Sequence, residues 1–480
     1  MQKRSSRCAD TPLCVDLDGT LIRTDSLIEG ILSILSQRRG IGKLPQLSAA
    51  TRAIFKQRVG ALADLRPELL PYNAELLEFL HGQKREGRRI VLVTAADQST
   101  AQSIANHLDL FDEIIASNGD RNLKGAAKAN ELVLRFGRKG FDYAGDSRAD
   151  LAVWREANGI IIVNASQAVA REARALGKVI AEFNCRRSPI LAMIRAMRPH
   201  QWVKNLLVFV PILASRSFTD WPAVLGALGM FVSFCAAASG IYLLNDLMDL
   251  TADRRHPTKR NRPFASGALS LPFGALFAIT LVATGLVLAH SVGASSLLLA
   301  YAAISFAYSL VLKQYPLLDV FILSALYTLR IVAGGVASEH RVTLWLLAFS
   351  GFLFLGLALV KRTREIAAND FNQSTVRRGY FPEDHAILQT FGVASAFAAC
   401  VVLALFVNST TAVETYAAPD LLWGLVPLIL FWQLRLWLST QRGHMHDDPI
   451  VYASRDWVSW WVAIGVIVVV LAASWGPVIW

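Results

Sequence analysis

The segment from Asn245 to Pro263 reads NDLMDLTADRRHPTKRNRP, and it separates two runs that contain no Lys, Arg, Asp or Glu. Trp221–Leu244 is 24 such residues long, and Phe264–Leu312 is 49. A helix needs about 20 apolar residues to cross a bilayer, so the first run accommodates one span and the second run two. A third uncharged run, Trp457–Trp480, has 24 residues. The sequence therefore predicts a polytopic helical membrane protein.

The frequency of acidic residues falls near Lys204 in this chain of 480 residues. Charged residues make up only 18% of it, against about 25% in a typical soluble protein. Of the 37 acidic residues, 22 precede Lys204 and 15 follow it, so the first part has the composition of a soluble domain. The apolar remainder predicts an all-α bundle of about nine spans, which are 205–219, 223–244, 271–290, 293–312, 317–336, 343–360, 387–407, 420–437 and 458–478.

The distribution of basic residues among the loops predicts how these spans are oriented in the membrane. Loops 245–264 and 361–386 are rich in Lys and Arg, whereas loop 408–419 has neither and loop 337–342 has one Arg. Because cytoplasmic loops carry the excess of Lys and Arg, nine spans place the N-terminal domain in the cytoplasm. The net charge of +11 is therefore assigned to a basic cytoplasmic face, and no nucleic acid partner is expected. The five cysteines show no C-x-x-C spacing, which argues against a zinc site.

Short apolar runs alternate with helical patterns in the first part of the chain. The expected strands are 13–17, 89–93, 113–116, 141–144 and 159–163. Strands that alternate with helices are typical of a parallel sheet. The stretch 25–70 has no strand candidate, which predicts a helical insertion. We expect an α/β domain over 1–184, a basic interfacial helix or a plain linker over 185–203, and the membrane bundle over 204–480.

Two carboxylates follow the first predicted strand. Asp16 and Asp18 stand in the sequence DLDGT. A carboxylate at the end of a strand can attack a phosphoryl group, and a second carboxylate two residues later returns to the same face and can protonate the leaving oxygen. The pattern resembles the haloacid dehalogenase superfamily, whose first motif is D-x-D-G-T. The resemblance implies a Rossmannoid phosphatase domain in which Asp16 is the nucleophile and Asp18 the general acid and base.

The other motifs of that superfamily occur in the expected order. Thr94 matches the second motif, and Lys128 matches the third, with Lys124 as an alternative. Asp146 and Asp150 match the acidic fourth motif. The resemblance implies that residues 25–70 form a substrate-selecting cap. It also implies a Mg²⁺ ion that is held by oxygen ligands of Asp16, Asp146, Asp150 and the Leu17 carbonyl. An inactive domain of the same fold stays an alternative.

Three aspartates lie at the end of the second predicted span. Asp246, Asp249 and Asp253 are three and four residues apart, which places them on one helical face. Burying carboxylates near a bilayer is costly, so ionisable residues there usually serve a function. A divalent cation and a diphosphate would relieve the repulsion between the three charges. The alternative to such a binding site is a solvent-exposed loop of mixed charge without a catalytic role.

The full string N-D-x-x-D-x-x-x-D-x-x-H-P-x-K-x-x-R-P resembles the UbiA superfamily of intramembrane prenyltransferases. The resemblance implies that Asp246 and Asp249 are catalytic and that these two residues and Asp253 bind Mg²⁺, so that each domain holds one ion. The second motif of that superfamily usually contains two or more acids at D-x-x-x-D spacing. Here Asp319 is followed by Leu323 at that spacing, and this departure points away from the ordinary aromatic prenyltransferases.

Several segments resemble the decaprenyl-phosphate phosphoribosyltransferase branch, among them RPHQWVKNLLVFVP (Arg198–Pro211) and LVKRTRE (Leu359–Glu365). In that branch the soluble substrate, phosphoribosyl diphosphate, carries the diphosphate, and a polyprenyl phosphate attacks the ribose C1. The resemblance implies cell-wall biosynthesis at a bacterial inner membrane. The substrate-binding residues expected on this basis are Lys204, Asn245, Lys259, Arg262, Tyr308, Lys313, Asp319, Lys361 and Arg362. Lys361 and Arg362 have membrane anchoring as an alternative role, and Asn245 and Tyr308 have packing.

The N-terminal phosphatase domain and the membrane transferase domain are expected to act one after the other on the same lipid. Phosphoribosyl transfer leaves a 5-phosphate on the lipid product, which the N-terminal phosphatase could remove. The alternative is transfer of a polyprenyl group from its diphosphate to an aromatic acceptor, with the N-terminal domain as a regulatory or binding module. The sequence is compatible with a homo-oligomer. It does not restrict the length of the prenyl chain of the lipid substrate.

Overall fold

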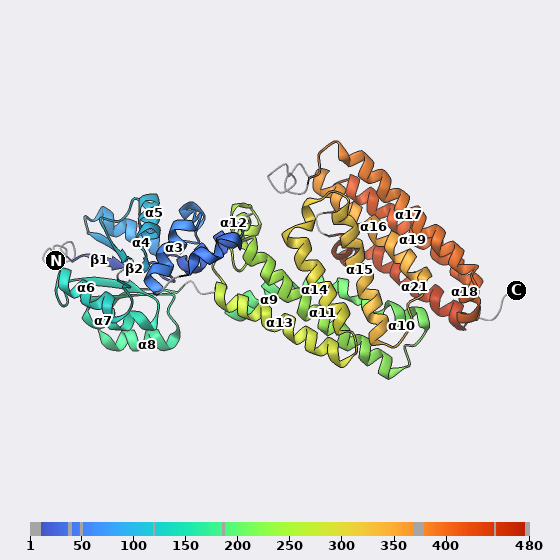
Figure 1. Ribbon diagram of the computed structural model, residues 1–480, viewed down its shortest axis with the longest axis horizontal. Helices are drawn as coiled ribbons and strands as arrows, with labels where there is room; N and C mark the ends of the chain where they lie inside the picture. The colour runs from blue at the N-terminus through green and yellow to red at the C-terminus, as the bar shows by residue number, and fades with distance from the viewer. Residues whose placement is uncertain are drawn as a thin grey trace. The chain divides into compact units, whose positions relative to one another are not determined.

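The computed structural model describes residues 11–36, 41–48, 51–118, 121–184, 188–367, 379–445 and 448–475. The chain forms two compact units (Figure 1). The first contains Met1–Ala196 and Leu243–Leu276, and the second contains Met197–Tyr242 and Phe277–Trp480. The first unit therefore includes the acidic segment as well as the N-terminal domain. The expected domain boundaries near 184 and 204 stay predictions.

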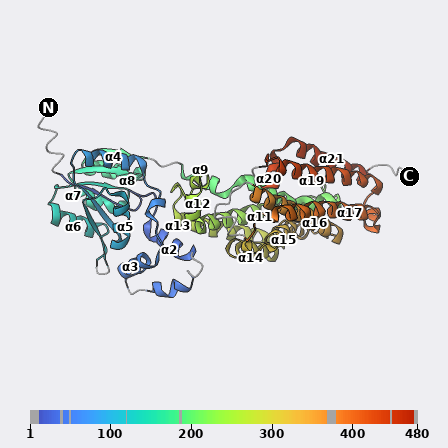
Figure 2. The same cartoon turned by 90° about the horizontal axis from the view of Figure 1, so that it is seen from above.

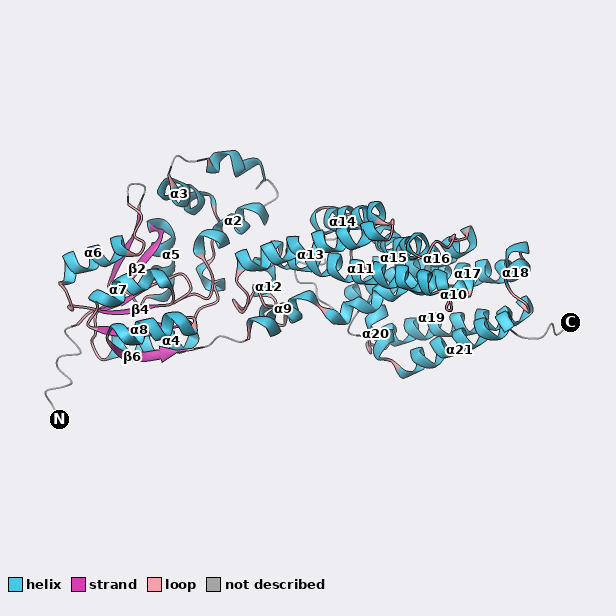
Figure 3. Cartoon of the chain, turned by 90° about the horizontal axis from the view of Figure 1, so that it is seen from below, coloured by secondary structure: helices cyan, strands magenta, loops and turns pink. Residues whose placement is uncertain are grey.

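A six-stranded parallel sheet forms the centre of the first unit (Figure 3). The strand order is β3-β2-β1-β4-β5-β6. The bounds are β1 Leu13–Val15, β2 Ile90–Asp97, β3 Glu113–Ser117, β4 Asp142–Gly145, β5 Gly159–Val163 and β6 Lys178–Phe183. The five expected strands and the α/β class are confirmed. The edge strand β6 was not predicted, because Lys178 and Glu182 interrupt its apolar pattern and alternate residues are exposed.

Helices cover both faces of the sheet (Figure 2). Because successive side chains of a strand point to opposite faces, Leu13 and Val15 pack in one core and Cys14 packs in the other. The first core also receives α4 Ala74–Arg85 and α5 Gln98–Leu108. The second core receives α6 Ala126–Phe136, α7 Leu151–Glu156 and α8 Gln167–Leu176.

The expected helical insertion is confirmed in the residues that the structure describes. It comprises α2 Ser26–Ser36, η1 Ile41–Leu47, α3 Arg52–Leu62 and η2 Pro67–Leu69. Residues 37–40 and 49–50 of the expected cap lie outside the described residues. The acidic segment of the same unit forms the end of α11, then α12 Leu250–Arg255 and η5 Lys259–Asn261.

Seven helices among the described residues are long and apolar enough to cross a membrane. They are α11 Trp221–Met248, α13 Leu271–Ser291, α15 Leu318–Ala337, α16 Leu344–Ala367, α17 Asp384–Val407, η8 with α19 over Pro419–Gln441, and α21 Trp457–Trp475. Shorter helices are α9 Pro189–Met197, η4 Pro199–Phe209, α10 Val210–Ser215, α14 Ser295–Leu310, η6 Leu312–Gln314, α18 Thr410–Thr415 and α20 Pro449–Arg455.

The expected count of nine spans is not confirmed. The expected span 205–219 is divided between the 3-10 helix η4 and the six-residue α10, and a proline near the start of α10 separates the two. Proline lacks a backbone N–H and clashes with the preceding turn, so one continuous α-helix does not form there. The expected span 293–312 forms α14, which has only 16 residues. Part of the expected linker helix forms α9, and its residues 185–187 lie outside the described residues.

Close backbone packing brings η4 against α15. A Cβ added to Gly334 would lie 2.0 Å from the Val208 carbonyl oxygen, so only glycine permits this approach. Small residues commonly allow such contacts between membrane helices. The approach places Asn205 of η4 within hydrogen-bond distance of Arg330 on α15.

Candidate active sites

The first candidate site lies at the carboxyl edge of the sheet. β1 and β4 are adjacent and parallel, with Val15 opposite Ala144, so the residues that follow these strands emerge side by side. Asp16 follows β1 and Asp146 follows β4. Gly19 has a φ of +81°, and a Cβ there would lie 2.3 Å from Asp146 Oδ2. Glycine therefore allows the loop after β1 to pass close to the second carboxylate.

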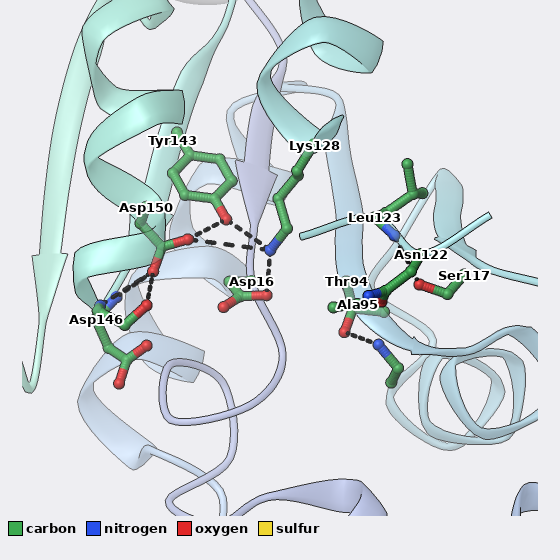
Figure 4. Close-up of polar contacts among 12 residues, drawn as sticks. Asp16, Thr94, Ala95, Ser117, Asn122, Leu123, Lys128, Tyr143, Asp146 and Asp150 are labelled. Carbon is green, nitrogen blue, oxygen red and sulfur yellow. Dashed lines mark hydrogen bonds and ion pairs between the residues drawn. The ribbon is translucent and has the colours of Figure 1, made fainter. Parts of the chain in front are cut away.

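Lys128 connects the carboxylates of this edge (Figure 4). Its Nζ donates to Asp16 Oδ1 at 2.7 Å and to the Tyr143 hydroxyl at 2.9 Å. The Tyr143 hydroxyl in turn donates to Asp150 Oδ1 at 2.8 Å. The structure thus brings Lys128 of α6 onto the Asp16 carboxylate, whereas the alternative Lys124 is exposed on the preceding loop.

The three carboxylates of this edge fit a divalent cation. One oxygen each of Asp16, Asp146 and Asp150 lies within 4.8 Å of the others. Asp150 Oδ2 accepts hydrogen bonds from the Ser147 N–H at 3.0 Å and the Ser147 hydroxyl at 2.8 Å, which hold its carboxylate in place. Carboxylate oxygens are the ligands that Mg²⁺ prefers. The donor set and the close passage at Gly19 therefore suit the ion that the sequence predicts.

Burial changes the proton affinity of this site. Burial raises the pKa of Asp16, although the charge of Lys128 opposes the effect. Burial and the charge of Asp25 raise the pKa of Asp18, although its Oδ1 accepts a 2.7 Å hydrogen bond from the Ser26 N–H. Burial alone would lower the pKa of Lys128, but the neighbouring carboxylates outweigh it and raise that pKa. Lys128 therefore stays charged, and Asp18 can hold a proton close to neutral pH.

The cap contributes a lysine that the sequence analysis missed. Lys56 of α3 is buried, and its Nζ donates to the Ala95 carbonyl at 2.5 Å and to Asn122 Oδ1 at 3.1 Å. The predicted Thr94 is fully buried one residue earlier in β2, and its hydroxyl oxygen accepts a hydrogen bond from the Ala96 N–H at 2.9 Å. A single lysine within a helical insertion carries no recognisable spacing, so no sequence signal could have revealed Lys56.

A cavity of about 1030 Å³ extends from these carboxylates. Its lining includes Asp16, Asp18, Lys56 and residues 266–273, all of the first unit. Within the same unit, Arg254 of α12 forms a two-pronged ion pair with Glu29 of α2, at 2.6 and 3.0 Å. Both side chains are only 6% exposed. The cap and the acidic segment are therefore joined by a buried ion pair.

The acidic segment is the second candidate site. α11 ends at Met248 and α12 begins at Leu250, so the α-helix is interrupted at Asp249. Helical hydrogen bonds nevertheless continue across it, because the Asp249 N–H donates to the Asn245 carbonyl and the Asp253 N–H donates to the Asp249 carbonyl, and a shared face of the three aspartates stays a prediction. Asp246 and Asp253 are buried, and Nη1 of Arg262 donates to both, at 3.1 and 2.7 Å. The guanidinium of Arg262 therefore lies between two of the three predicted metal ligands.

Other predicted residues of this segment lie nearby in the chain. Asn245 is half-buried near the end of α11, and Lys259 is half-buried at the start of η5. Among the described residues, only the cluster at the sheet edge brings three acidic ligand atoms within 4.8 Å of one another. Mg²⁺ binding by Asp246, Asp249 and Asp253 therefore stays a prediction.

In the second unit, Lys204 and Lys361 meet at a carboxylate that the sequence analysis did not find. Lys204 Nζ lies 2.8 Å from Asp448 Oδ2, and Lys361 Nζ lies 3.3 Å from the same oxygen. Asp448 precedes a proline at the start of α20 and accepts from the Ile450 N–H as a helix cap. The Asp-Pro pair indicates a helix start, but nothing in the sequence relates it to two distant lysines.

Asp319 and Arg362 form a separate buried pair. Asp319 is fully buried and Arg362 is 1% exposed, and the two side chains make an ion pair. The Tyr380 hydroxyl donates to Asp319 Oδ1 at 2.5 Å. Arg362 also pairs with Glu365. Tyr308 on α14 and Lys313 on η6 are half-buried. The structure therefore places four of the predicted residues of this unit in two clusters, Lys204 with Lys361 and Asp319 with Arg362.

The comparisons with known proteins match the two parts of the chain to two different families. Residues 206–447 match the UbiA prenyltransferase family, and residues 13–155 match the haloacid dehalogenase-like hydrolases. The uncharacterized protein y4nM of Sinorhizobium fredii is 38% identical over 460 residues, 94% of this chain and 89% of that one. Nodulation protein NoeC of Azorhizobium caulinodans is 38% identical over 56% of this chain and 88% of that one. Decaprenyl-phosphate phosphoribosyltransferase of Mycolicibacterium smegmatis is 34% identical over 50% of this chain and 79% of that one.

An acidic sheet edge in one domain and apolar spanning helices in the other define an integral membrane enzyme with a phosphatase domain and a transferase domain. The chain belongs to the UbiA prenyltransferase family, and its N-terminal part is a haloacid dehalogenase-like domain. Both resemblances that the sequence shows are thus confirmed.

Proposed function

We propose that the chain transfers 5-phosphoribose from phosphoribosyl diphosphate to a polyprenyl phosphate, and that its phosphatase domain then removes the 5-phosphate from the product. The name of the Mycolicibacterium smegmatis relative describes the first of these reactions for decaprenyl phosphate, and its 34% identity supports the proposal. The buried pair of Arg254 and Glu29 supports the second part, because it joins the cap of the phosphatase to the acidic segment of the transferase.

The choice of phosphoribosyl diphosphate as the donor rests on the surroundings of Asp319. This carboxylate is fully buried, is paired with the guanidinium of Arg362 and accepts a hydrogen bond from the hydroxyl of Tyr380. A carboxylate in a buried ion pair is a poor ligand for an additional cation, because the cation would have to compete with the guanidinium for the carboxylate oxygens. The prenyltransferases that the sequence resembles use a second acidic motif here. A site with one paired acid therefore favours the phosphoribosyl donor over a prenyl diphosphate.

In the transfer reaction, an oxygen of the lipid phosphate attacks the ribose C1 while the bond from C1 to the diphosphate breaks. The diphosphate leaves with increasing negative charge, which the site must stabilise. Mg²⁺ bound by Asp246, Asp249 and Asp253 would supply a Lewis acid for that charge. Arg262 contacts two of these carboxylates and can bind the diphosphate. The remaining proposed substrate-binding residues are Lys204, Asn245, Lys259, Tyr308, Lys313, Asp319, Lys361 and Arg362.

In the phosphatase reaction, the Asp16 carboxylate attacks phosphorus and the bond to the ribose oxygen breaks. Asp18 donates a proton to that leaving oxygen and later accepts one from the water that hydrolyses the aspartyl phosphate. Lys128 offsets the negative charge of the phosphoryl group, and Thr94 orients it. Mg²⁺ at Asp16, Asp146 and Asp150 would offset further charge.

We further propose the cellular arrangement that the sequence predicts. The basic loops and the phosphatase domain lie in the cytoplasm at a bacterial inner membrane. Residues 1–184 form the phosphatase domain, residues 185–203 contain an interfacial helix, and residues 204–480 form the transferase. The membrane supplies the lipid, and the cytoplasm supplies the soluble donor.

One experiment tests the whole proposal. The purified full-length protein is incubated with Mg²⁺, a polyprenyl phosphate and phosphoribosyl diphosphate labelled in the ribose, and the lipids are analysed by mass spectrometry. We expect labelled polyprenyl phosphoryl ribose together with released diphosphate and phosphate. A parallel reaction contains a polyprenyl diphosphate and an aromatic acid. Product in that reaction alone would contradict the proposal and would favour aromatic prenyl transfer.

If Asp18 protonates the leaving oxygen, its removal should matter most for substrates with a poor leaving group. Asp18→Asn should slow the first turnover of ribose 5-phosphate by about 10²- to 10⁴-fold, because the ribose oxygen needs a proton. It should slow the first turnover of an aryl phosphate much less, because a phenolate leaves without one. In the wild type, the rate with ribose 5-phosphate should fall as the pH rises through the raised pKa of Asp18, since the acid loses its proton. Rapid-quench measurements check this, and equal losses with both substrates would contradict it.

A further inference from the structure

Two lysines of the transferase share a single oxygen atom. Lys204 comes from η4 and Lys361 from α16, and both ammonium groups contact Oδ2 of Asp448. The other oxygen, Oδ1, faces the Ile450 N–H at 3.3 Å, so the carboxylate is oriented by the start of α20. Two ammonium groups that contact the same oxygen lie next to each other. Asp448 therefore overcomes the repulsion that would otherwise separate them.

The cluster is buried at Asp448 and Lys204 and partly exposed at Lys361. The side chains of Asp448 and Lys204 are 6% and 10% exposed, whereas that of Lys361 is 30% exposed. The ring of Tyr327 lies 5.8 Å from the Lys204 ammonium, and the Tyr327 hydroxyl lies 3.4 Å from Asp448 Oδ1. An anion can therefore approach from the side of Lys361 without displacing the buried carboxylate.

A buried arginine adds positive charge beside this cluster. Arg330 is 4% exposed, and it donates to Asn205 Oδ1 at 2.9 Å, to the Leu326 carbonyl and to the Tyr301 hydroxyl. All three of these acceptors are neutral. Its guanidinium also lies 5.6 Å from the ring of Tyr327, which borders the lysine cluster. Positive charge inside an apolar bundle is costly, and such residues usually serve an anionic ligand or a transport path.

We infer that Asp448 is a positioning residue, which holds the ammonium groups of Lys204 and Lys361 side by side so that together they bind one phosphate group of a substrate. This inference rests on the proposed function. Compact ammonium groups are suited to phosphate oxygens, and two adjacent ones bind a phosphate more firmly than one. The phosphate belongs either to the headgroup of the lipid or to the diphosphate of the soluble donor, and separate measurements distinguish the two sources.

The test compares Asp448→Asn with a matched variant, Asp456→Asn, in the purified full-length protein. Asp456 is also a buried helix cap, with a side chain 9% exposed, but it pairs with Arg435 and contacts neither lysine. We expect Asp448→Asn to raise the KM for the polyprenyl phosphate or for phosphoribosyl diphosphate by about tenfold, with kcat within about threefold of the wild type. Asp456→Asn should leave both KM values within about twofold, even where it lowers Tm by the same amount.

Two further measurements separate positioning from a structural role. Asp448→Glu should restore part of the lost affinity, because it keeps the charge. Asp448→Asn combined with Lys204→Gln should lose less than the product of the two single losses, because Asp448 acts through Lys204. Unchanged KM values for both substrates, a lower KM, or a loss confined to kcat would overturn the inference.

A binding measurement separates this inference from the proposed function. Inorganic diphosphate and a short-chain polyprenyl monophosphate serve as probes of thermal stabilisation. At least one of them should stabilise the wild type more than Asp448→Asn. If the wild type transfers no phosphoribose, the proposed function fails, yet this difference still supports the phosphate site. If neither probe distinguishes the two proteins, the phosphate site is overturned whether or not transfer occurs.

Discussion

Asp16→Asn should make the enzyme accumulate a lipid that still carries the 5-phosphate. The substitution keeps the size of the side chain and removes the nucleophile, so phosphate release should fall by about a thousandfold or more. Phosphoribosyl transfer should continue, because the acidic segment and its contacts with Arg262 are unchanged. Mass spectrometry of the lipid products should show polyprenyl phosphoryl ribose from the wild type and its 5-phosphate from the variant.

The matched control for this experiment is Asp112→Asn. Asp112 lies at the opposite edge of the sheet, just before β3, where it pairs with Lys84 at 2.5 Å. This variant should release phosphate at the wild-type rate. Removing the Asp16 charge leaves Lys128 with a weaker partner, since Asp150 is 4.0 Å away, so the Tm of both variants should be compared. The same phosphorylated lipid from the wild type and Asp16→Asn would contradict a phosphatase role on this product.

Asp246→Asn should abolish transfer, with a loss of about a thousandfold. Asp246 is buried at the end of α11, so the substitution removes a proposed Mg²⁺ ligand and one of the two carboxylates that hold the guanidinium of Arg262 in place. Hydrolysis of free ribose 5-phosphate by the phosphatase domain should be unchanged. Incorporation of labelled ribose into lipid measures the first activity, and phosphate release measures the second.

Asp220→Asn is the control for this prediction. Asp220 is exposed just before the other end of α11, and its neutralisation should leave transfer unchanged. An excess of chelator should stop the wild-type reaction, and added Mg²⁺ should restore it. Normal turnover in chelator, or with Asp246 and Asp249 both neutralised, would contradict a metal-assisted departure of diphosphate from this segment.

The order of strands and helices in the phosphatase domain was predictable, because each central strand is a continuous apolar run. The edge strand β6 was not, because its exposed side carries charges. The count of nine spans is not confirmed, since hydropathy alone does not show where a proline and a 3-10 helix interrupt an apolar stretch. The interruption at Asp249 escaped prediction for a related reason. Residue spacing assumes a regular helix, whereas the backbone departs from it at that residue.

Residues close together in the chain were identified more readily than contacts between distant segments. DLDGT and the acidic segment each concentrate their chemistry within a few residues, so these short motifs and the resemblances they carry predicted phosphoryl chemistry and a diphosphate site. Asp448 lies 87 residues after Lys361 and 244 after Lys204 along the chain, and no local pattern joins the three. The same holds for Glu29 and Arg254, which only the folded first unit brings into contact.

The sequence by itself determined that this protein has a soluble α/β domain and an apolar helical domain, and which carboxylates lie at the ends of their elements. These properties follow from composition, periodicity and short motifs, which are local. Only the tertiary structure decided which charges neutralise one another: Lys128 on Asp16, Arg362 on Asp319, and two lysines on Asp448. Electrostatic energy depends on distance in space and on burial, and neither can be read from positions along a chain.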